Sequence, residues 1–271
     1  MPELPEVETI MKMVKHHLIH KTIREIRVYN PKLRWPINVN DIRNIVGLKI
    51  KKVYRRGKYI IITFSSSKLT LVIHLGMTGI ISIKHAEEHV RTKHDHLLIK
   101  LDNRLFVFND VRKFGSIHIT EELESLFLIN HLGIEPLSIK LNENYLYAKS
   151  RNRACTIKDF IMNQKVIVGV GNIYATESLF LSKIRPTRLA KDLTKKNYKT
   201  LSNNIKIVLK AAIKLGGTTI KDYKNAEGKP GYFTQKLLVY QKKYCPIHKR
   251  TLLSNIKLSG RSSFYCSKCQ K

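Results

Sequence analysis

The chain has 271 residues, of which 43% are hydrophobic, and 50 Lys and Arg against 20 Asp and Glu give it a formal net charge of +30. This much apolar content fills the cores of two modest domains, which excludes a disordered chain. Positive charge spread along the whole length attracts a polyanion. Nucleic acid is the leading candidate, although solvated surface lysines would give the same composition.

Neither a membrane span nor a secretory signal is expected. The sequence has no run of 18 apolar residues, and its first residues include acids in place of the basic and then apolar regions of a signal peptide. We therefore expect a cytoplasmic protein without membrane contact. Three of the four cysteines crowd the C-terminus, which suits metal binding better than disulfides in a reducing compartment.

The first half of the chain predicts a helix followed by strands. Apolar residues at helical spacing predict a helix over residues 3–19, with Pro5 in its first turn and the acids Glu3 and Glu6 near its positive end. From about residue 22 to residue 120, short β-rich runs alternate with turn formers, which predicts antiparallel hairpins in a sandwich. The clearest expected strands are residues 59–64, 69–75, 96–101 and 105–108.

The second half predicts helices. Thr156 and Asp159 resemble a capping box that opens a helix, and a tight glycine turn at Gly169–Asn172 leads into the next one. That turn presents backbone N–H groups at a helix start, an arrangement that binds anions or simply lets two helices pack closely. Residues 216–232, rich in Gly, Thr and Lys, are expected to form a mobile loop. The expected helices begin at residue 157, cover residues 173–181 and cover residues 198–212.

The C-terminal segment has the spacing of a metal site. Two residues lie between Cys245 and His248, and two lie between Cys266 and Cys269. Seventeen residues separate the two pairs. Four such ligands predict a tetrahedral structural Zn²⁺ site without an open position. The alternative is that His248 is incidental and the cysteines are reduced thiols. Arg261 precedes Cys266 where a hairpin tip would present it to phosphates, although a lone arginine is more often an ordinary surface residue.

The N-terminus offers a nucleophile. If Met1 is removed, Pro2 exposes a secondary amine, and its attack on an aldehydic sugar carbon forms an iminium that cannot lose its charge. The neighbouring Glu3 could protonate a departing sugar oxygen, and Glu6 could orient or share that proton. The alternative is a good helix start with acids placed on the helix dipole.

The ordered motifs resemble bacterial formamidopyrimidine-DNA glycosylase from residue 2 to residue 271. They are Pro2–Thr9, Lys58 after Gly57, His74–Gly79, Asp110–Gly115, Gly169–Phe180, Gly228–Phe233 and the C-terminal Cys and His module. The resemblance implies an α+β fold. It has an N-terminal β-sandwich with an initial helix (1–132), a helical helix-two-turns-helix domain (133–238) and a zinc-finger hairpin (239–271), with DNA between the first two.

The resemblance also implies an activity. The chain would act as a monomer on damaged double-stranded DNA, remove oxidised purines such as 8-oxoguanine and formamidopyrimidines, and cut the strand by β,δ-elimination. Pro2 would be the Schiff-base nucleophile and Glu3 the proton donor to the sugar. Lys58 would be the proton donor for β-elimination, and Arg261 would serve δ-elimination and phosphate binding.

Further residues match DNA contacts of the family. Met77, Arg112 and Phe114 would fill the gap left by an everted nucleotide, which agrees with the need to offset the cost of unstacking a base. As an alternative, Met77 and Phe114 could be core residues, but nearby glycines favour loop tips. The loop at 216–232 would cover the extruded base. Backbone contacts would come from His94, Lys113, Arg153, Lys158 and Asn172.

The sequence departs from the family pattern at two places, and two alternative functions remain open. His248 stands where the family usually has Cys, with a spacing one residue longer, and Lys113 replaces an Arg, which turns a bidentate phosphate fork into a point charge. The nearest rival is the sister endonuclease that prefers oxidised pyrimidines. The other is a non-catalytic zinc-finger DNA-binding protein on the same scaffold. The intact Pro2, Glu3, Lys58 and Arg261 argue against it.

Overall fold

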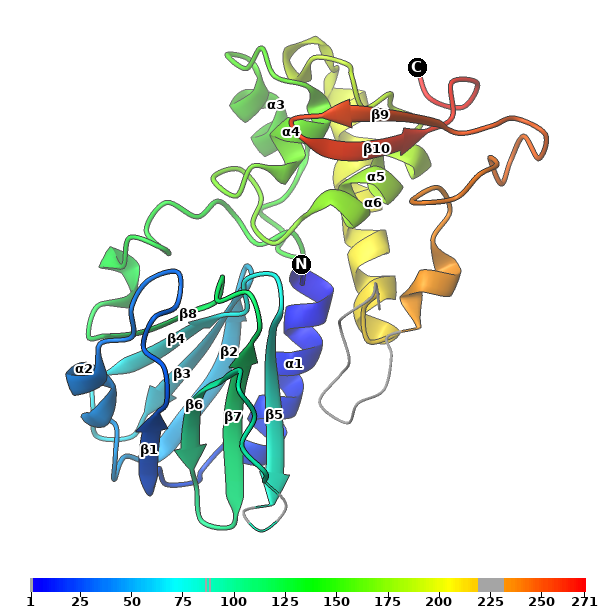
Figure 1. Ribbon diagram of the computed structural model, residues 1–271. Coiled ribbons are helices and arrows are strands. Elements are labelled where there is room, and N and C mark those ends of the chain that lie inside the picture. Colours follow the sequence, from blue (N-terminus) through cyan, green and yellow to red (C-terminus); the bar gives the residue numbers. More distant parts are fainter. Residues whose placement is uncertain (1, 86, 88, 219–231) are drawn as a thin grey trace. The chain divides into compact units, whose positions relative to one another are not determined.

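The computed structural model describes residues 2–85, 87, 89–218 and 232–271 (Figure 1). These residues fall into two compact units, one of residues 2–130 with Thr218 and the other of residues 131–217 with 232–271. Apart from Thr218, the described residues of the predicted segments 133–238 and 239–271 lie in the second unit, so the boundary between these segments stays a prediction. Within the described ranges, no helix is long and apolar enough to cross a membrane.

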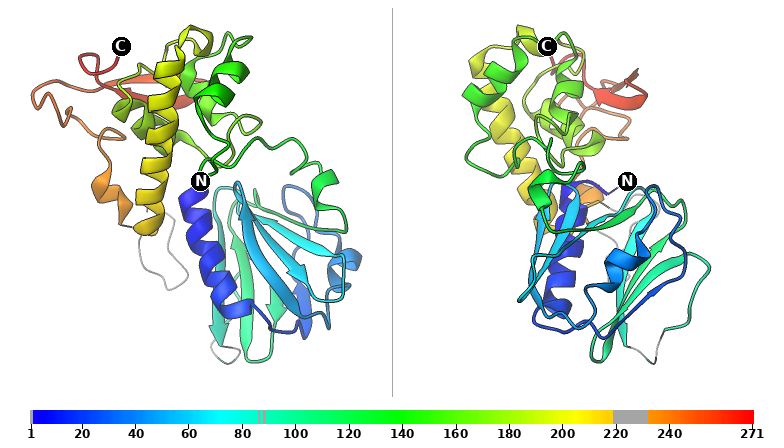
Figure 2. Two further views of the ribbon diagram at one scale, coloured as in Figure 1. Left: turned by 180° about the vertical axis from the view of Figure 1, so that it is seen from behind. Right: turned by 90° about the vertical axis from the view of Figure 1, so that its left-hand side faces the viewer.

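The first unit is a sandwich of two four-stranded antiparallel sheets with a helix beside them (Figure 2). The helix is α1 (Leu4–Leu18), and side chains from it and from both sheets share one buried core, including Val14, Ile62 and Phe106. This confirms the predicted sandwich and initial helix. One sheet has the order β1 (Glu25–Val28), β6 (Asp95–Lys100), β7 (Arg104–Asp110) and β5 (Gly79–His85); the other has β2 (Ile50–Arg56), β3 (Tyr59–Phe64), β4 (Thr70–His74) and β8 (Ser116–Thr120).

The second unit is a group of packed helices with one hairpin. Helix α6 packs against α3 and α5, α4 packs against α5, and strand β10 packs against α5. The large rings of Phe160, Tyr174 and Tyr198 are fully buried among them. The elements are α3 (Glu143–Ser150), α4 (Ile157–Met162), α5 (Asn172–Leu181), α6 (Lys195–Lys214), β9 (Ser254–Leu258) and β10 (Arg261–Tyr265). Shorter helices of the chain are α2 (Val39–Arg43), η2 (Leu123–Ser125), η3 (Ala190–Asp192) and η4 (Phe233–Lys236).

Helix α4 begins where its cap was predicted, because the Thr156 hydroxyl accepts a hydrogen bond from the Asp159 N–H at 3.1 Å. The connection to α5 is held by Gln164. Its Oε1 accepts from the Gly169 N–H at 2.7 Å, and its Nε2 donates to the Val170 carbonyl at 3.1 Å. Gly169 has φ +80°, a conformation that glycine adopts without strain. The predicted turn between two helices is therefore confirmed.

The predicted loop at 216–232 is described only at its two ends. Gly216, Gly217 and Thr218 follow α6, and Tyr232 precedes η4. Residues 219–231, which include the Gly228–Gly231 part of the family motif, lie outside the described residues.

Candidate active site and metal centre

The N-terminal end of α1 places two of the predicted catalytic residues in a buried setting. Pro2 is buried, and Glu3, which caps the helix, is 4% exposed. The Glu3 N–H donates to Glu6 Oε2 at 2.8 Å, while Glu6 Oε1 accepts from the N–H and the hydroxyl of Thr218 at 2.7 and 3.0 Å. Both oxygens of the Glu6 carboxylate therefore accept hydrogen bonds from backbone N–H groups. They fix Glu3, which follows Pro2, and Thr218, which lies near the start of the predicted lesion-covering loop.

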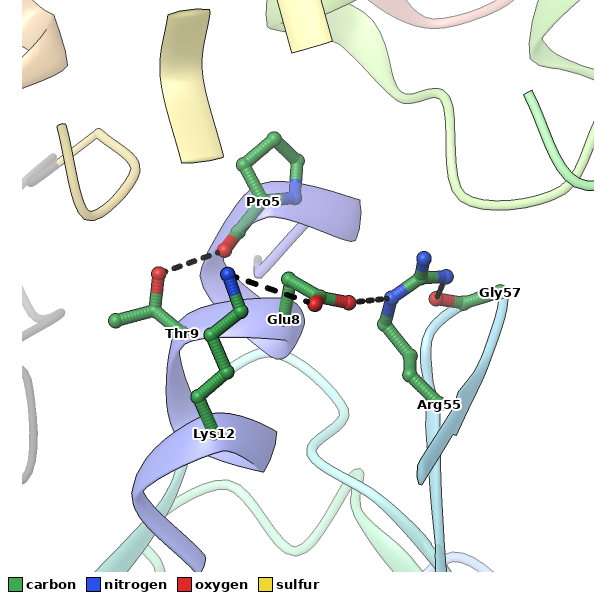
Figure 3. Close-up of polar contacts among 6 residues, drawn as sticks. All are labelled: Pro5, Glu8, Thr9, Lys12, Arg55 and Gly57. Carbon is green, nitrogen blue, oxygen red and sulfur yellow. Dashed lines mark hydrogen bonds and ion pairs between the residues drawn. The ribbon is translucent and has the colours of Figure 1, made fainter. Parts of the chain in front are cut away.

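The turn that carries Lys58 is tied to the same helix through Arg55 (Figure 3). Arg55 Nε donates to Glu8 Oε2 at 2.7 Å, and Arg55 Nη1 donates to the Gly57 carbonyl at 2.9 Å. Lys12 lies 3.8 Å from the other oxygen of Glu8, one helical turn along α1. The side chains of Arg55 and Glu8 are only 9% and 17% exposed, so this ion pair is poorly screened by solvent. Lys58 is thus held at a fixed place relative to the helix that begins at Pro2.

His74 joins this group, although no role of its own was predicted for it. It pairs with Tyr59 across β3 and β4, and the two rings lie 4.8 Å apart. Burial, and then the nearby charge of Lys58, lower the pKa of His74 to about 4. The imidazole is therefore neutral at pH 7. Because Nδ1 accepts a hydrogen bond from the Gly76 N–H at 3.1 Å, the proton belongs on Nε2, which becomes a donor beside Lys58.

The three predicted intercalating residues lie on two loops that touch. Met77, Arg112 and Phe114 are all exposed, and the guanidinium carbon of Arg112 lies 4.6 Å from the centre of the Phe114 ring. Gly76 makes the approach possible: its φ is +61°, and a Cβ added there would lie 2.3 Å from the Phe114 backbone. The alternative that Met77 and Phe114 are core residues is wrong.

The buried carboxylate of Asp110 holds these two loops together. It accepts hydrogen bonds from the Thr78 hydroxyl on one loop and from the Gly115 N–H, at 2.7 Å, on the other. The Asp110 N–H also donates to the His94 carbonyl at 3.0 Å. The structure thus brings His94 and the exposed Lys113, both predicted phosphate contacts, to the same turn. Asp110 lies within a quoted motif, but its role depends on contacts that one sequence does not reveal.

The predicted metal ligands converge in the second unit. The potential ligand atoms of Cys245, His248, Cys266 and Cys269 all lie within 4.8 Å of one another. Cys245 Sγ lies 3.5 Å from Cys269 Sγ, and His248 Nδ1 lies 3.9 Å from the sulfurs of Cys245 and Cys266. A tetrahedral ion with bonds of about 2.0–2.3 Å needs edges of about 3.5–3.8 Å. These four side chains can hold a metal ion, and His248 takes part despite its exposure.

In the hairpin of β9 and β10, Arg261 is the first residue of β10. It is exposed and directly follows the tight turn. Two predicted phosphate contacts meet this hairpin. Lys158 is 1% exposed and donates to the Ser262 carbonyl at 3.0 Å and to Ser263 Oγ at 2.6 Å. Asn172 Nδ2 donates to the same Ser262 carbonyl at 3.1 Å. Arg153, by contrast, is exposed just after α3.

Comparison with known proteins identifies the family. A sequence model of the formamidopyrimidine-DNA glycosylase N-terminal domain matches residues 1–117, and one of the formamidopyrimidine-DNA glycosylase H2TH domain matches residues 132–224. The formamidopyrimidine-DNA glycosylase of Glaesserella parasuis is 44% identical over 100% of this chain and 99% of its own length. The chain belongs to the formamidopyrimidine-DNA glycosylase family.

Other members of the formamidopyrimidine-DNA glycosylase family match equally along the whole chain. One from Haemophilus influenzae is 44% identical over 100% of this chain and 99% of its own length. Among solved structures, a Lactococcus lactis variant in complex with DNA containing Fapy-dG has a TM-score of 0.90 at 31% identity, covering 100% of both chains. The wild-type Lactococcus lactis protein in complex with DNA containing an oxidised pyrimidine has a TM-score of 0.89 at 30% identity, again covering 100% of both.

Proposed function

We propose that this chain excises oxidised purines from double-stranded DNA through Pro2 and then cuts the strand by β- and δ-elimination. The observation that carries the proposal is the buried start of α1, where Pro2 and Glu3 adjoin and to which Arg55 ties the turn of Lys58. A nucleophile, an acid and an ammonium donor are thereby assembled in one unit of the protein. The relatives that share the whole chain are formamidopyrimidine-DNA glycosylases.

The first step requires Met1 to be removed, because an amide nitrogen at Pro2 has no nucleophilicity. The free secondary amine attacks the sugar carbon that bears the damaged base. The bond to the base breaks with its electron pair going to the base, which takes up the proton that the amine nitrogen releases. Glu3 protonates the sugar ring oxygen, so the ring opens and leaves an iminium. The iminium has no N–H to lose and stays an electron sink for the eliminations.

The strand is then cut at both phosphates. Loss of a proton from the sugar carbon next to the iminium expels the 3′ phosphate, with Lys58 supplying a proton, and a second elimination expels the 5′ phosphate with Arg261 at that phosphate. Met77, Arg112 and Phe114 fill the gap in the duplex, and His94, Lys113 and Arg153 contact its backbone. One copy of the chain suffices for this reaction, and we expect it in the cytoplasm with the chromosome.

We further propose that the ion held by Cys245, His248, Cys266 and Cys269 is Zn²⁺. Three thiolates and one imidazole within 4.8 Å of one another are a donor set that zinc prefers. Four protein ligands leave no open position, so zinc would supply folding energy to the finger and no step of the reaction.

Borohydride trapping tests the nucleophile. We expect the protein to form a reduced covalent adduct at Pro2 on a duplex with 8-oxoguanine opposite cytosine, located by peptide mapping. Pro2→Gly keeps an amine but loses the secondary-amine geometry, so its strand scission should fall roughly tenfold or more. Pro5→Ala is the matched control, since it removes a proline from the first turn of the helix that follows Pro2 and should nick like the wild type.

Two results would count against the proposal. Wild-type nicking by Pro2→Gly would refute the nucleophile. Efficient trapping on thymine glycol and none on 8-oxoguanine would favour the rival specificity for oxidised pyrimidines, a lesion class that the Lactococcus lactis protein holds in one solved complex.

A further inference from the structure

Lys158 is a lysine whose ammonium is buried inside the second unit. The residue is 1% exposed, and its Nζ donates to the Ser262 carbonyl at 3.0 Å and to Ser263 Oγ at 2.6 Å. Both acceptors are neutral. Taking an ammonium out of water is costly unless its protons are bonded, so the hydrogen bonds to β10 determine where this strand lies against α4.

The two acceptors directly follow Arg261. The Ser263 hydroxyl, which accepts from Lys158, lies 3.4 Å from the Arg261 carbonyl and donates to it. Asn172 Nδ2, at the start of α5, donates to the same Ser262 carbonyl at 3.1 Å. Residues from two helices therefore hold the start of β10. Lys158 and Asn172 precede Ser262 by 104 and 90 residues in the sequence.

The hairpin leaves Arg261 little freedom once this strand is fixed. Ser259 and Gly260 have φ of +45° and +76°, so both central residues of the two-residue turn lie in the left-handed region. Arg261 pairs with Leu258 directly across the turn. A shift of Ser262 relative to α4 would thus carry the Arg261 guanidinium with it.

We propose that Lys158 is a positioning residue that holds Arg261 for the second elimination through Ser262 and Ser263, and that it makes no contact with DNA. The part played by Arg261 rests on the proposed function. The placing of the hairpin rests on the hydrogen bonds alone. A direct phosphate contact would need an ammonium at the surface, whereas Lys158 is 1% exposed and donates two hydrogen bonds to the hairpin.

Two measurements test the proposal on Lys158→Met, which keeps the apolar stem and removes the ammonium. The first is amide hydrogen exchange over residues 254–265 in the zinc-loaded protein without DNA. The second is the ratio of δ- to β-elimination products on an abasic-site duplex. Lys165→Met is the matched control, because it removes an exposed lysine, and the same charge, from the same unit. Arg261→Ala sets the scale for the product ratio.

For Lys158→Met we expect exchange in the hairpin at least tenfold faster and a product ratio shifted at least fivefold toward β-elimination. Borohydride trapping at Pro2 and zinc content should stay within twofold of the wild type. Ser263→Ala keeps the ammonium and removes one acceptor, so it should shift both readouts in the same direction by less. If Lys158→Met does not fold, the same two measurements on Ser263→Ala test the proposal.

The proposal would be overturned if both Lys158→Met and Ser263→Ala kept the hydrogen exchange and the product ratio of the wild type. It would also be overturned if Lys158→Met lost trapping and both eliminations to the same extent. If Arg261→Ala leaves the product ratio unchanged, the proposed role of Arg261 fails, and hydrogen exchange then decides the positioning by Lys158 independently.

Discussion

His74 shows how the fold changes the chemistry of a single residue. In water a histidine is partly protonated near neutral pH, but here the ring is buried against Tyr59 and its pKa lies at about 4. A neutral imidazole can donate from Nε2 to a phosphate or to a leaving oxygen without adding to the repulsion of Lys58. The sequence could not show this, because the burial of His74 depends on the pairing of β4 with β3 and β8.

The same shift makes stability depend on pH. Between pH 6.5 and about 4 the unfolded chain binds a proton at this histidine and the folded chain does not. Stability is therefore present above pH 6.5 and is lost as the pH falls toward 4, by about 2–3 kcal/mol from this residue. We expect His74→Asn to flatten the decline of the unfolding free energy, measured by urea titration from pH 7.5 to pH 4.5.

His16→Asn, which removes an exposed histidine of α1, is the control for losing a histidine as such. A decline in His74→Asn as steep as in the wild type would show that the proton is taken up elsewhere. His118 adds to the decline in the same direction as His74, because burial lowers its pKa, whereas Glu177 acts in the opposite direction. Burial raises the pKa of Glu177, so its contribution is present at low pH and is lost as the pH rises.

At the scale of elements, sequence periodicity predicted the three longest helices well, whereas the eight-residue helix α3 was not predicted. The strand at 59–64 was found at its full length, and the helices α1, α4, α5 and α6 were found within a few residues at their ends. The five-residue helix α2 was not predicted, because so short a helix has little stability of its own and exists through its contacts with β1 and β8.

Hydrogen bonds and ion pairs between elements distant in the sequence could not be predicted either. Glu177 in α5 accepts hydrogen bonds from the N–H groups of Leu238, Val239 and Tyr240, at 2.8–3.0 Å, some 61–63 residues away. Nothing near Glu177 in the sequence predicts these donors. The same holds for Arg55, whose partners became clear only once α1 was packed on β2. The local signals of Pro2, Lys58 and the cysteines could be found because their spacing or motif is contained in a short segment.

The finger is the element most dependent on a ligand. Few large apolar residues lie in it, so metal binding must supply much of its folding energy. We expect the purified protein to hold one equivalent of zinc and to lose affinity for damaged DNA when a chelator removes it, measured by metal analysis and fluorescence anisotropy. His248→Ala should lose the metal more readily than the wild type.

Two variants sharpen that comparison. Cys155→Ser removes the cysteine that lies outside the cluster and should leave zinc content unchanged. His248→Cys restores a fourth thiol and should still hold zinc. Full affinity for damaged DNA in a metal-free preparation would remove the finger from the mechanism.

For the whole molecule, the net charge of +30 is far larger than solubility requires. Its effect is a long-range field that raises the association rate with DNA and falls with ionic strength. The number of phosphates that the protein neutralises is a separate quantity, since it counts only the cations that lie at the backbone in the complex. The structure divides the candidates, because Lys113 and Arg153 are exposed whereas Lys158 is buried.

The salt dependence of binding distinguishes these two kinds of lysine. Each phosphate contact contributes about −0.9 to the slope of log K against log salt concentration on duplex DNA. We expect Lys113→Met to make the slope shallower by about 1, and Lys158→Met to change it by no more than Arg261→Ala does, because Lys158 would act on DNA only through Arg261. The measurement is fluorescence anisotropy from about 50 to about 200 mM salt. A slope shallower for Lys158→Met than for Arg261→Ala would return Lys158 to the DNA backbone. Because each of these variants loses one positive charge, the change in net charge cannot account for a difference between them.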